Sequence, residues 1–154
     1  MTKMEKGFCF IVFLLAAALS FNYSSAYGQK AVSVRVRLIL ASNEPGFSGA
    51  SPELNDIAGN LGSLFKYKGY KLLKSSTRSV SPGKPATMSL PYGTKLEISS
   101  AGGGKNGRSL SVRWLQTQRG EIVSTQVRLR GRNPVLIGGP SVKDGVLIIA
   151  LSLR

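Results

Sequence analysis

The amino-acid sequence predicts an α+β protein in which one helix packs on a mainly antiparallel β-sheet, folded as a sandwich or partial barrel. Three observations support this fold class. Residues 32–41 alternate between apolar and other side chains, and residues 52–65 place apolar side chains at the spacing of a helix. Beyond residue 66, short apolar runs are separated by breaks of hairpin length.

The first expected strand covers residues 32–41. Ser33, Arg35 and Arg37 lie on one face of it, whereas the valines and leucines at even positions lie on the other. A period of two over ten residues is typical of a half-buried strand. Residues 42–50 are rich in Asn, Pro, Gly and Ser, so they are expected to form a loop.

One helix is expected from Pro52 to about Phe65. Ser51 would supply the capping hydroxyl, Pro52 is tolerated in the first turn, and Glu53 and Asp56 would compensate the positive end of the helix dipole. The face turned to the core is a single apolar stripe, made of Leu54, Ile57, Ala58, Leu61, Leu64 and Phe65.

The remainder of the chain is expected to form seven strands separated by turns. Their expected ranges are 70–80, 86–90, 95–100, 108–117, 122–130, 135–137 and 146–153. The last of them is apolar on both faces, which predicts a central place in its sheet. No repeat or long linker interrupts residues 27–154, so one domain is expected there.

The first residues have the order of a signal peptide. Two lysines come first, twelve apolar residues from Phe8 to Leu19 follow, and small polar residues come next. A helix of twelve residues rises about 18 Å, which is short for a hydrocarbon layer of about 30 Å, although an uncleaved anchor remains the alternative. Residues 1–26 are therefore expected to direct export to the periplasm or the extracellular space, with cleavage after Ala26 or Gly28.

Composition limits which ligands and which reactions the chain is suited to. Removal of Lys3, Lys6 and Glu5 from 21 basic and 7 acidic residues leaves 19 and 6, a net charge of +13. This excess favours anionic partners. The chain has no histidine, and its one cysteine, Cys9, lies in the expected signal peptide, so no cofactor or metal is expected and an enzyme is not favoured. A small hydrolase built from its scattered acidic residues is kept as an alternative.

The candidate binding residues are basic and occur in two stretches. Tyr67 and Tyr70 accompany the first stretch and could stack on bases or sugars. Arginines two apart on a strand share a face and could track phosphates or sulfates, as could Arg35 and Arg37 on the first strand. The alternative is that these side chains only solvate a sheet face. The candidate anion-binding residues are Lys66, Lys68, Lys71, Arg128, Arg130 and Arg132.

Two glycine-rich segments have simple structural interpretations. In residues 102–107, Lys105 is followed by Asn106 and then a strand, so a flexible hairpin is expected rather than a phosphate-binding loop. Residues 134–140 are expected to be a strand ending in a tight turn, or alternatively backbone held open for a partner strand. Trp114 is expected to be core or sheet surface rather than a ligand platform.

Several segments together carry a resemblance. They read VRVRLILASNE, PELNDI, FKYKGYKLL and VLIGGPSVKDGVLIIAL, with a strand after LPYG. Over residues 32–151 the chain resembles a group of small exported bacterial proteins with a β-α-β start and a β-rich remainder, which implies export and this fold but no catalytic residues. Residues 135–147 are also similar to sheet segments of outer-membrane secretins, from which this chain differs in its short length.

These observations favour an exported, non-enzymatic module that binds a macromolecular partner or surface component of the cell envelope. The main alternative is a polyanion-binding protein whose basic sheet face recognises acidic glycan, lipid phosphate or extracellular nucleic acid, the last being less favoured. No transmembrane segment is expected after signal cleavage.

Overall fold

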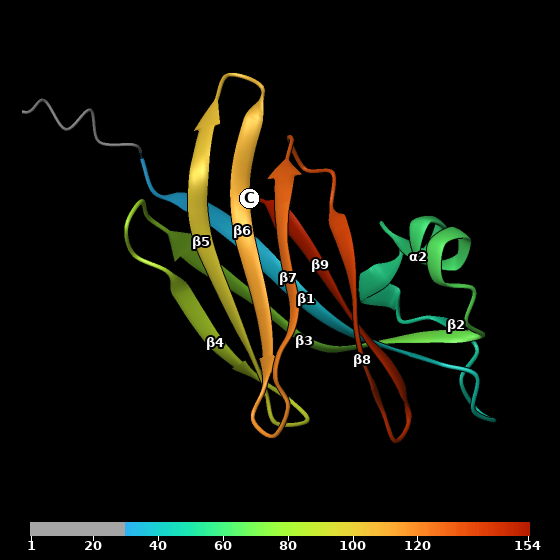
Figure 1. Cartoon of the computed structure of the whole chain (residues 1–154). Coiled ribbons are helices and arrows are strands. Elements are labelled where there is room, and N and C mark those ends of the chain that lie inside the picture. The colour runs from blue at the N-terminus through green and yellow to red at the C-terminus, as the bar shows by residue number, and fades with distance from the viewer. Residues whose placement is uncertain (1–29) are drawn as a thin grey trace, which may run out of the picture.

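The computed structural model describes residues 30–154, and the expected signal peptide with its cleavage sites lies outside this range. The described chain forms an α+β fold with two sheets and a short helical segment, residues 52–65 (Figure 1). In chain order its elements are β1 (Val32–Ser42), β2 (Gly49–Ala50), the 3-10 turn η1 (Pro52–Leu54), α2 (Ala58–Phe65), β3 (Gly69–Val80), β4 (Ala86–Leu90), β5 (Thr94–Gly104), β6 (Gly107–Gln116), β7 (Gly120–Leu129), β8 (Val135–Val142) and β9 (Gly145–Leu153).

The first sheet has five strands in the order β2-β3-β1-β9-β8. All neighbours in it are antiparallel except β2, which pairs with β3 in parallel through two residues. β1 lies between β3 and β9, and from Val36 onward it is buried on both faces rather than on one face as its alternation predicts. The prediction that the last strand is central is confirmed, because β9 lies between β1 and β8.

The second sheet, in the order β4-β5-β6-β7, packs against one face of the first. Even-numbered residues of β1, such as Val34 and Leu38, meet inward-facing residues of β5 and β6, such as Ile98 and Trp114. Trp114 is fully buried, so of the two expected places, core or sheet surface, the structure gives the core. Burial of these apolar surfaces is the main stabilising contribution to a fold of this kind.

A second, smaller core lies on the other face of the five-stranded sheet. Leu54, Ile57 and Leu61 pack there against Ile39 of β1 and Ile148 of β9. In Figure 1 α2 accordingly lies away from the four-stranded sheet, near β2 and β8. The five-stranded sheet is therefore the middle layer, although the helical segment covers only part of its outer face.

The helix is shorter than its sequence predicts. Pro52–Leu54 forms a 3-10 turn, and α2 begins only at Ala58. The prediction that Leu64 faces the core is wrong, because its side chain is 66% exposed. Ser51 is not a side-chain cap either, because its Oγ donates to the carbonyl of Tyr70 and accepts from the amide of Leu72, which ties the turn to β3.

Two predicted turns are strand instead. β8 continues through Gly138, Gly139 and Pro140 with a register shift, where a turn is expected from the glycines. A side chain at position 139 would meet the ring of Trp114, so Gly139 admits close packing between the two sheets, whereas Gly138 faces Phe65 of α2. Likewise β5 and β6 extend to Gly104 and Gly107, which leaves a two-residue turn where a six-residue loop is expected.

Within residues 30–154, no helix has the length and apolar character needed to cross a membrane.

Candidate anion-binding site

The outer face of the five-stranded sheet changes from apolar to polar midway along its strands. On β1 the change falls between Ile39, which packs under the helical segment, and Arg37. On β9 it falls between Ala150 and Ser152. The helical segment covers the apolar half, so the polar half is left uncovered as the wall of a cavity.

Antiparallel register aligns the side chains of this polar half into rows. Arg35 of β1 stands between Thr77 of β3 and Ser152 of β9. One row further along, Arg37 lies opposite Ser75. Side chains directly opposite each other on one face have Cβ atoms about 5 Å apart. Each arginine of β1 therefore has at least one hydroxyl beside it.

Arg37 is the most buried member of the site, with 2% of its side chain exposed. Its guanidinium binds Asp56 through two parallel hydrogen bonds, Nη1 to Oδ1 at 2.7 Å and Nη2 to Oδ2 at 2.9 Å. Nη1 also donates to the carbonyl of Glu53 at 3.4 Å. Asp56 comes from the connection between η1 and α2, so this bidentate pair joins the helical segment to the sheet at the edge of the cavity.

The sequence position of Asp56 predicts that its carboxylate compensates the helix dipole, but this prediction is wrong. Asp56 lies before α2 and binds Arg37. The hydrogen bonds from Arg37 lower the pKa of Asp56 below its usual value, burial opposes them, and the positive charges of Arg37 and Arg35 lower that pKa further. Asp56 is therefore ionised at neutral pH.

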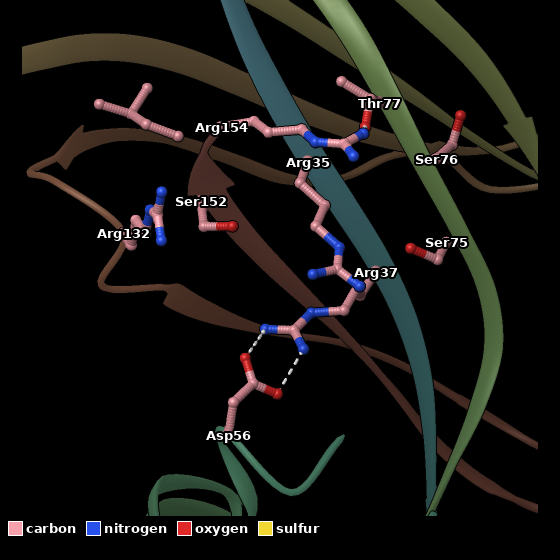
Figure 2. A pocket seen from close by; sticks show the side chains of 10 residues that line it. Arg35, Arg37, Asp56, Ser75, Ser76, Thr77, Arg132, Ser152 and Arg154 are labelled. Atoms are coloured by element: carbon pink, nitrogen blue, oxygen red, sulfur yellow. Dashed lines mark hydrogen bonds and ion pairs between the residues drawn. The ribbon is translucent and has the colours of Figure 1, made fainter. Parts of the chain in front are cut away.

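One donor of Arg37 stays free. Its Nε is buried and has no hydrogen-bond partner among the described residues. In Figure 2 this nitrogen lies on the Arg35 side of the guanidinium, away from Asp56. Unpartnered buried donors are rare in native proteins and call for a physical explanation.

Two further arginines complete the rim of the cavity. Arg154 follows β9, and its Nη1 donates to Oγ1 of Thr77 at 3.3 Å. Arg132 comes from the turn between β7 and β8. Figure 2 shows the side chains of Arg35, Arg132 and Arg154 arranged around the space above Ser152. The cavity volume is about 560 Å³, within the range of small-molecule sites.

The charge of the cavity is strongly positive. Ten described residues line it, and their side chains include four guanidinium groups and one carboxylate, a net of three positive charges. Its remaining polar side chains are the hydroxyls of Ser75, Thr77 and Ser152, because Ser76 pairs with Val36 and turns its hydroxyl to the other face of the sheet. None of the ten residues is aromatic. Such a wall can bind and orient anionic oxygens, because guanidinium and hydroxyl groups donate to them.

The structure brings one of the six sequence candidates into this cavity, namely Arg132. Arg128 lies at the end of β7 in the four-stranded sheet, and Arg130 follows that strand. Both side chains are exposed, and neither lines the cavity. Lys66, Lys68 and Lys71 are exposed near α2 and the start of β3. The two basic stretches therefore do not form one surface around this cavity, and their binding of anions stays a prediction.

The aromatic residues of the first basic stretch have structural contacts. Tyr70 is buried, and its hydroxyl donates to the carbonyl of Leu61 at 3.0 Å and accepts from the amide of Tyr67 at 2.9 Å. The expectation that Tyr70 could stack on a ligand is therefore wrong, because its ring lies between the helix and the sheet.

Three other acidic residues of the described chain take part in contacts outside the cavity. Glu97 and Glu121 both bind Arg113 on the four-stranded sheet, at 3.1 and 2.7 Å. Asp144 accepts from the hydroxyl of Tyr92 at 3.4 Å. Across residues 30–154, no group of three or more His, Cys, Asp or Glu side chains could hold a metal ion.

Sequence reasoning missed Arg154 and the hydroxyl residues, and it noted Arg35 and Arg37 only as a row on the first strand. The sequence nevertheless contains a pattern that indicates this site. The outward-facing positions of three strands change from apolar to polar at one level, from Ile39 to Arg37, from Leu72 to Ser75 and from Ala150 to Ser152. Recognising it requires the strand order and register, which the sequence alone does not provide.

Comparison with known proteins yields no relative for this arrangement: no family model, no curated protein and no solved structure matches the chain.

Proposed function

We propose that this protein is an exported, non-enzymatic binding module whose ligand is an anionic component of the cell envelope or of the extracellular space. The observation that supports this most is the cavity on the outer face of the five-stranded sheet, with four arginines, three hydroxyls and one carboxylate. Export is inferred from the apolar run from Phe8 to Leu19, with the basic residues before it and the small residues after it.

The chemistry of the lining favours binding over hydrolysis. The one carboxylate in it, Asp56, is held by both terminal nitrogens of Arg37 and has a lowered pKa, so it is a poor general base. The hydroxyls have no neighbouring base in the lining that could activate them as nucleophiles. Guanidinium groups and hydroxyls in this number serve to hold anionic oxygens.

The proposal is tested by comparing two double variants that remove the same charge from different places. Arg35→Gln with Arg154→Gln empties the cavity of two guanidinium groups. Arg128→Gln with Arg130→Gln removes two exposed arginines outside it. Binding to immobilised heparin, polygalacturonate and neutral dextran is measured by biolayer interferometry at about 50 mM and about 200 mM salt.

We expect the unmodified protein to bind at least one of the two anionic polymers, with affinity that falls as salt rises, and not to bind dextran. The cavity variant should lose about tenfold or more in affinity, whereas the matched variant should change much less. Equal losses in both variants would assign binding to net charge alone. Affinity that does not fall as salt rises would contradict the proposal, because ion pairs between guanidinium groups and a polyanion weaken with salt.

A further inference from the structure

We propose that the group bound at the base of this cavity is a phosphate monoester, held between Arg35 and Arg37 with the hydroxyls of Thr77 and Ser152 beside it. This inference rests on the proposed function and specifies the chemical class of the ligand. It follows from the free donor of Arg37, from the directions of the neighbouring donors, and from the charge of the lining.

The free donor marks the position of the ligand. Asp56 occupies both terminal nitrogens of Arg37 and leaves Nε–H without a partner, although the side chain is 2% exposed. A buried N–H on a charged group without an acceptor is destabilising. Asp56 cannot satisfy it from its present place. An acceptor supplied by a ligand on the Arg35 side would do so after a small shift of the side chains that now cover Nε.

The surrounding donors converge from three strands. Arg35 projects from β1 between Thr77 on one side and Ser152 on the other, and Arg37 is the next outward-facing residue of the same strand. An anion between the two guanidinium groups therefore has hydroxyl donors on both flanks. A phosphate monoester presents three acceptor oxygens in different directions, whereas a carboxylate presents two in one plane.

The charge of the lining also favours a dianion. The side chains around the cavity carry a net of three positive charges after Asp56 has offset one. A carboxylate would reduce this to two, but a phosphate monoester carries about −1.5 to −2 at neutral pH and reduces it further. Repulsion between Arg35 and Arg37 decreases as more of their charge is compensated, so the dianion has the advantage.

The lining further restricts what carries the phosphate. None of the ten lining residues is aromatic, so the cavity offers no aromatic ring on which a nucleobase could stack. Its hydroxyls, in contrast, suit the hydroxyls of a sugar or glycerol. The phosphate is accordingly expected on a sugar or glycerol unit, either as a soluble compound or as a lipid head group.

The test follows the Nε–H protons of the arginines by NMR during titration with glycerol 3-phosphate, with acetate at matched ionic strength as the comparison. We expect the Arg37 Nε–H signal to move to lower field and saturate with glycerol 3-phosphate, and to move little with acetate. Lowering the pH through about 6 should weaken binding several-fold, since the phosphate then becomes a monoanion. Arg35→Lys should weaken it about tenfold, whereas Arg128→Lys should not.

Sedimentation with phosphatidylcholine vesicles, with and without phosphatidic acid, identifies the source of the phosphate. Binding to the phosphatidic acid vesicles supports a lipid head group, and binding to glycerol 3-phosphate alone supports a soluble ligand. An unmoved Arg37 Nε–H signal, together with polygalacturonate binding that the Arg35 and Arg154 double variant loses, would overturn the phosphate assignment and leave the proposed function standing. Failure of every anionic probe would overturn both.

Discussion

Arg37 and Asp56 stand 19 residues apart in the chain and meet in a bidentate ion pair at the border between the two halves of one sheet face. On one side of the pair, Ile39 lies under Leu54 and Leu61 in an apolar core. On the other side lie Arg35 and the hydroxyls of the cavity. The pair thus fixes the helical segment where the core ends and the candidate site begins.

Replacing Asp56 with Asn should destabilise the fold. The change removes the carboxylate from a guanidinium that is 98% buried and leaves its charge uncompensated, although the Asp56 side chain itself is 57% exposed. The expected loss in the free energy of unfolding is roughly 1–3 kcal/mol, measured by urea denaturation at neutral pH. Arg37→Met should lose less, since Asp56 can then be hydrated. Equal losses in the two variants would contradict this account.

The same pair predicts a pH dependence. The pKa of Asp56 is lowered in the folded protein by its hydrogen bonds to Arg37, so the carboxylate binds a proton more readily in the unfolded chain. Its stabilising contribution is therefore present above about pH 4 and lost as the pH falls through the lower folded value. The difference in unfolding free energy between the unmodified protein and Asp56→Asn should be largest near neutral pH and shrink in acid. A difference that stays constant down to pH 2 would argue against the assignment.

A side chain at position 139 should be poorly tolerated. A Cβ there would run into the ring of Trp114, which is fully buried and cannot move aside. Gly139→Ala should therefore cost about 1–3 kcal/mol in unfolding free energy, seen as a lower midpoint of thermal or urea unfolding. Gly62→Ala is the matched control, because its site in α2 is open and alanine is the better helix former. An unchanged midpoint for Gly139→Ala would show that the sheets can separate locally.

The two leucines of α2 should respond differently to truncation. Leu61 is fully buried in the smaller core, whereas Leu64 is 66% exposed. Leu61→Ala should cost about 2–5 kcal/mol in unfolding free energy, and Leu64→Ala should stay within about 0.5 kcal/mol of the unmodified protein. Comparable losses in unfolding free energy at the two positions would show that Leu64 is buried, which contradicts its exposure in this structure.

The fold class and most strands are predictable from the sequence because apolar alternation is a local property. The two faces of β1 and the central place of β9 follow from Val32–Ala41 and Val146–Leu153 alone. The start of α2 was not predictable, because Asp56 leaves the first turn to bind an arginine of a distant strand. The strand through Gly138 and Gly139 was missed for a similar reason: these residues resemble a turn until Trp114 is seen against them.

The candidate site was less predictable than the fold. Of the six candidate anion-binding residues only Arg132 lines the cavity, which it reaches from the turn after β7, and the sequence indicates Arg35 and Arg37 only as a row on the first strand. The partners of Arg132 come from β1, β3 and the residue after β9, so their meeting depends on the order of the sheet. Counting basic residues in the sequence favours dense stretches such as residues 66–74, whereas the cavity gathers single arginines from separate strands.

The claim that the polar half of this sheet face is an anion site is tested most directly by mapping backbone amide shifts during titration with a short heparin oligosaccharide. The account predicts saturable shifts in residues 33–37, 75–77 and 152–154, with little change in residues 109–113 and 124–128 of the other sheet. Shifts concentrated on the four-stranded sheet, or spread evenly over all basic residues, would contradict it.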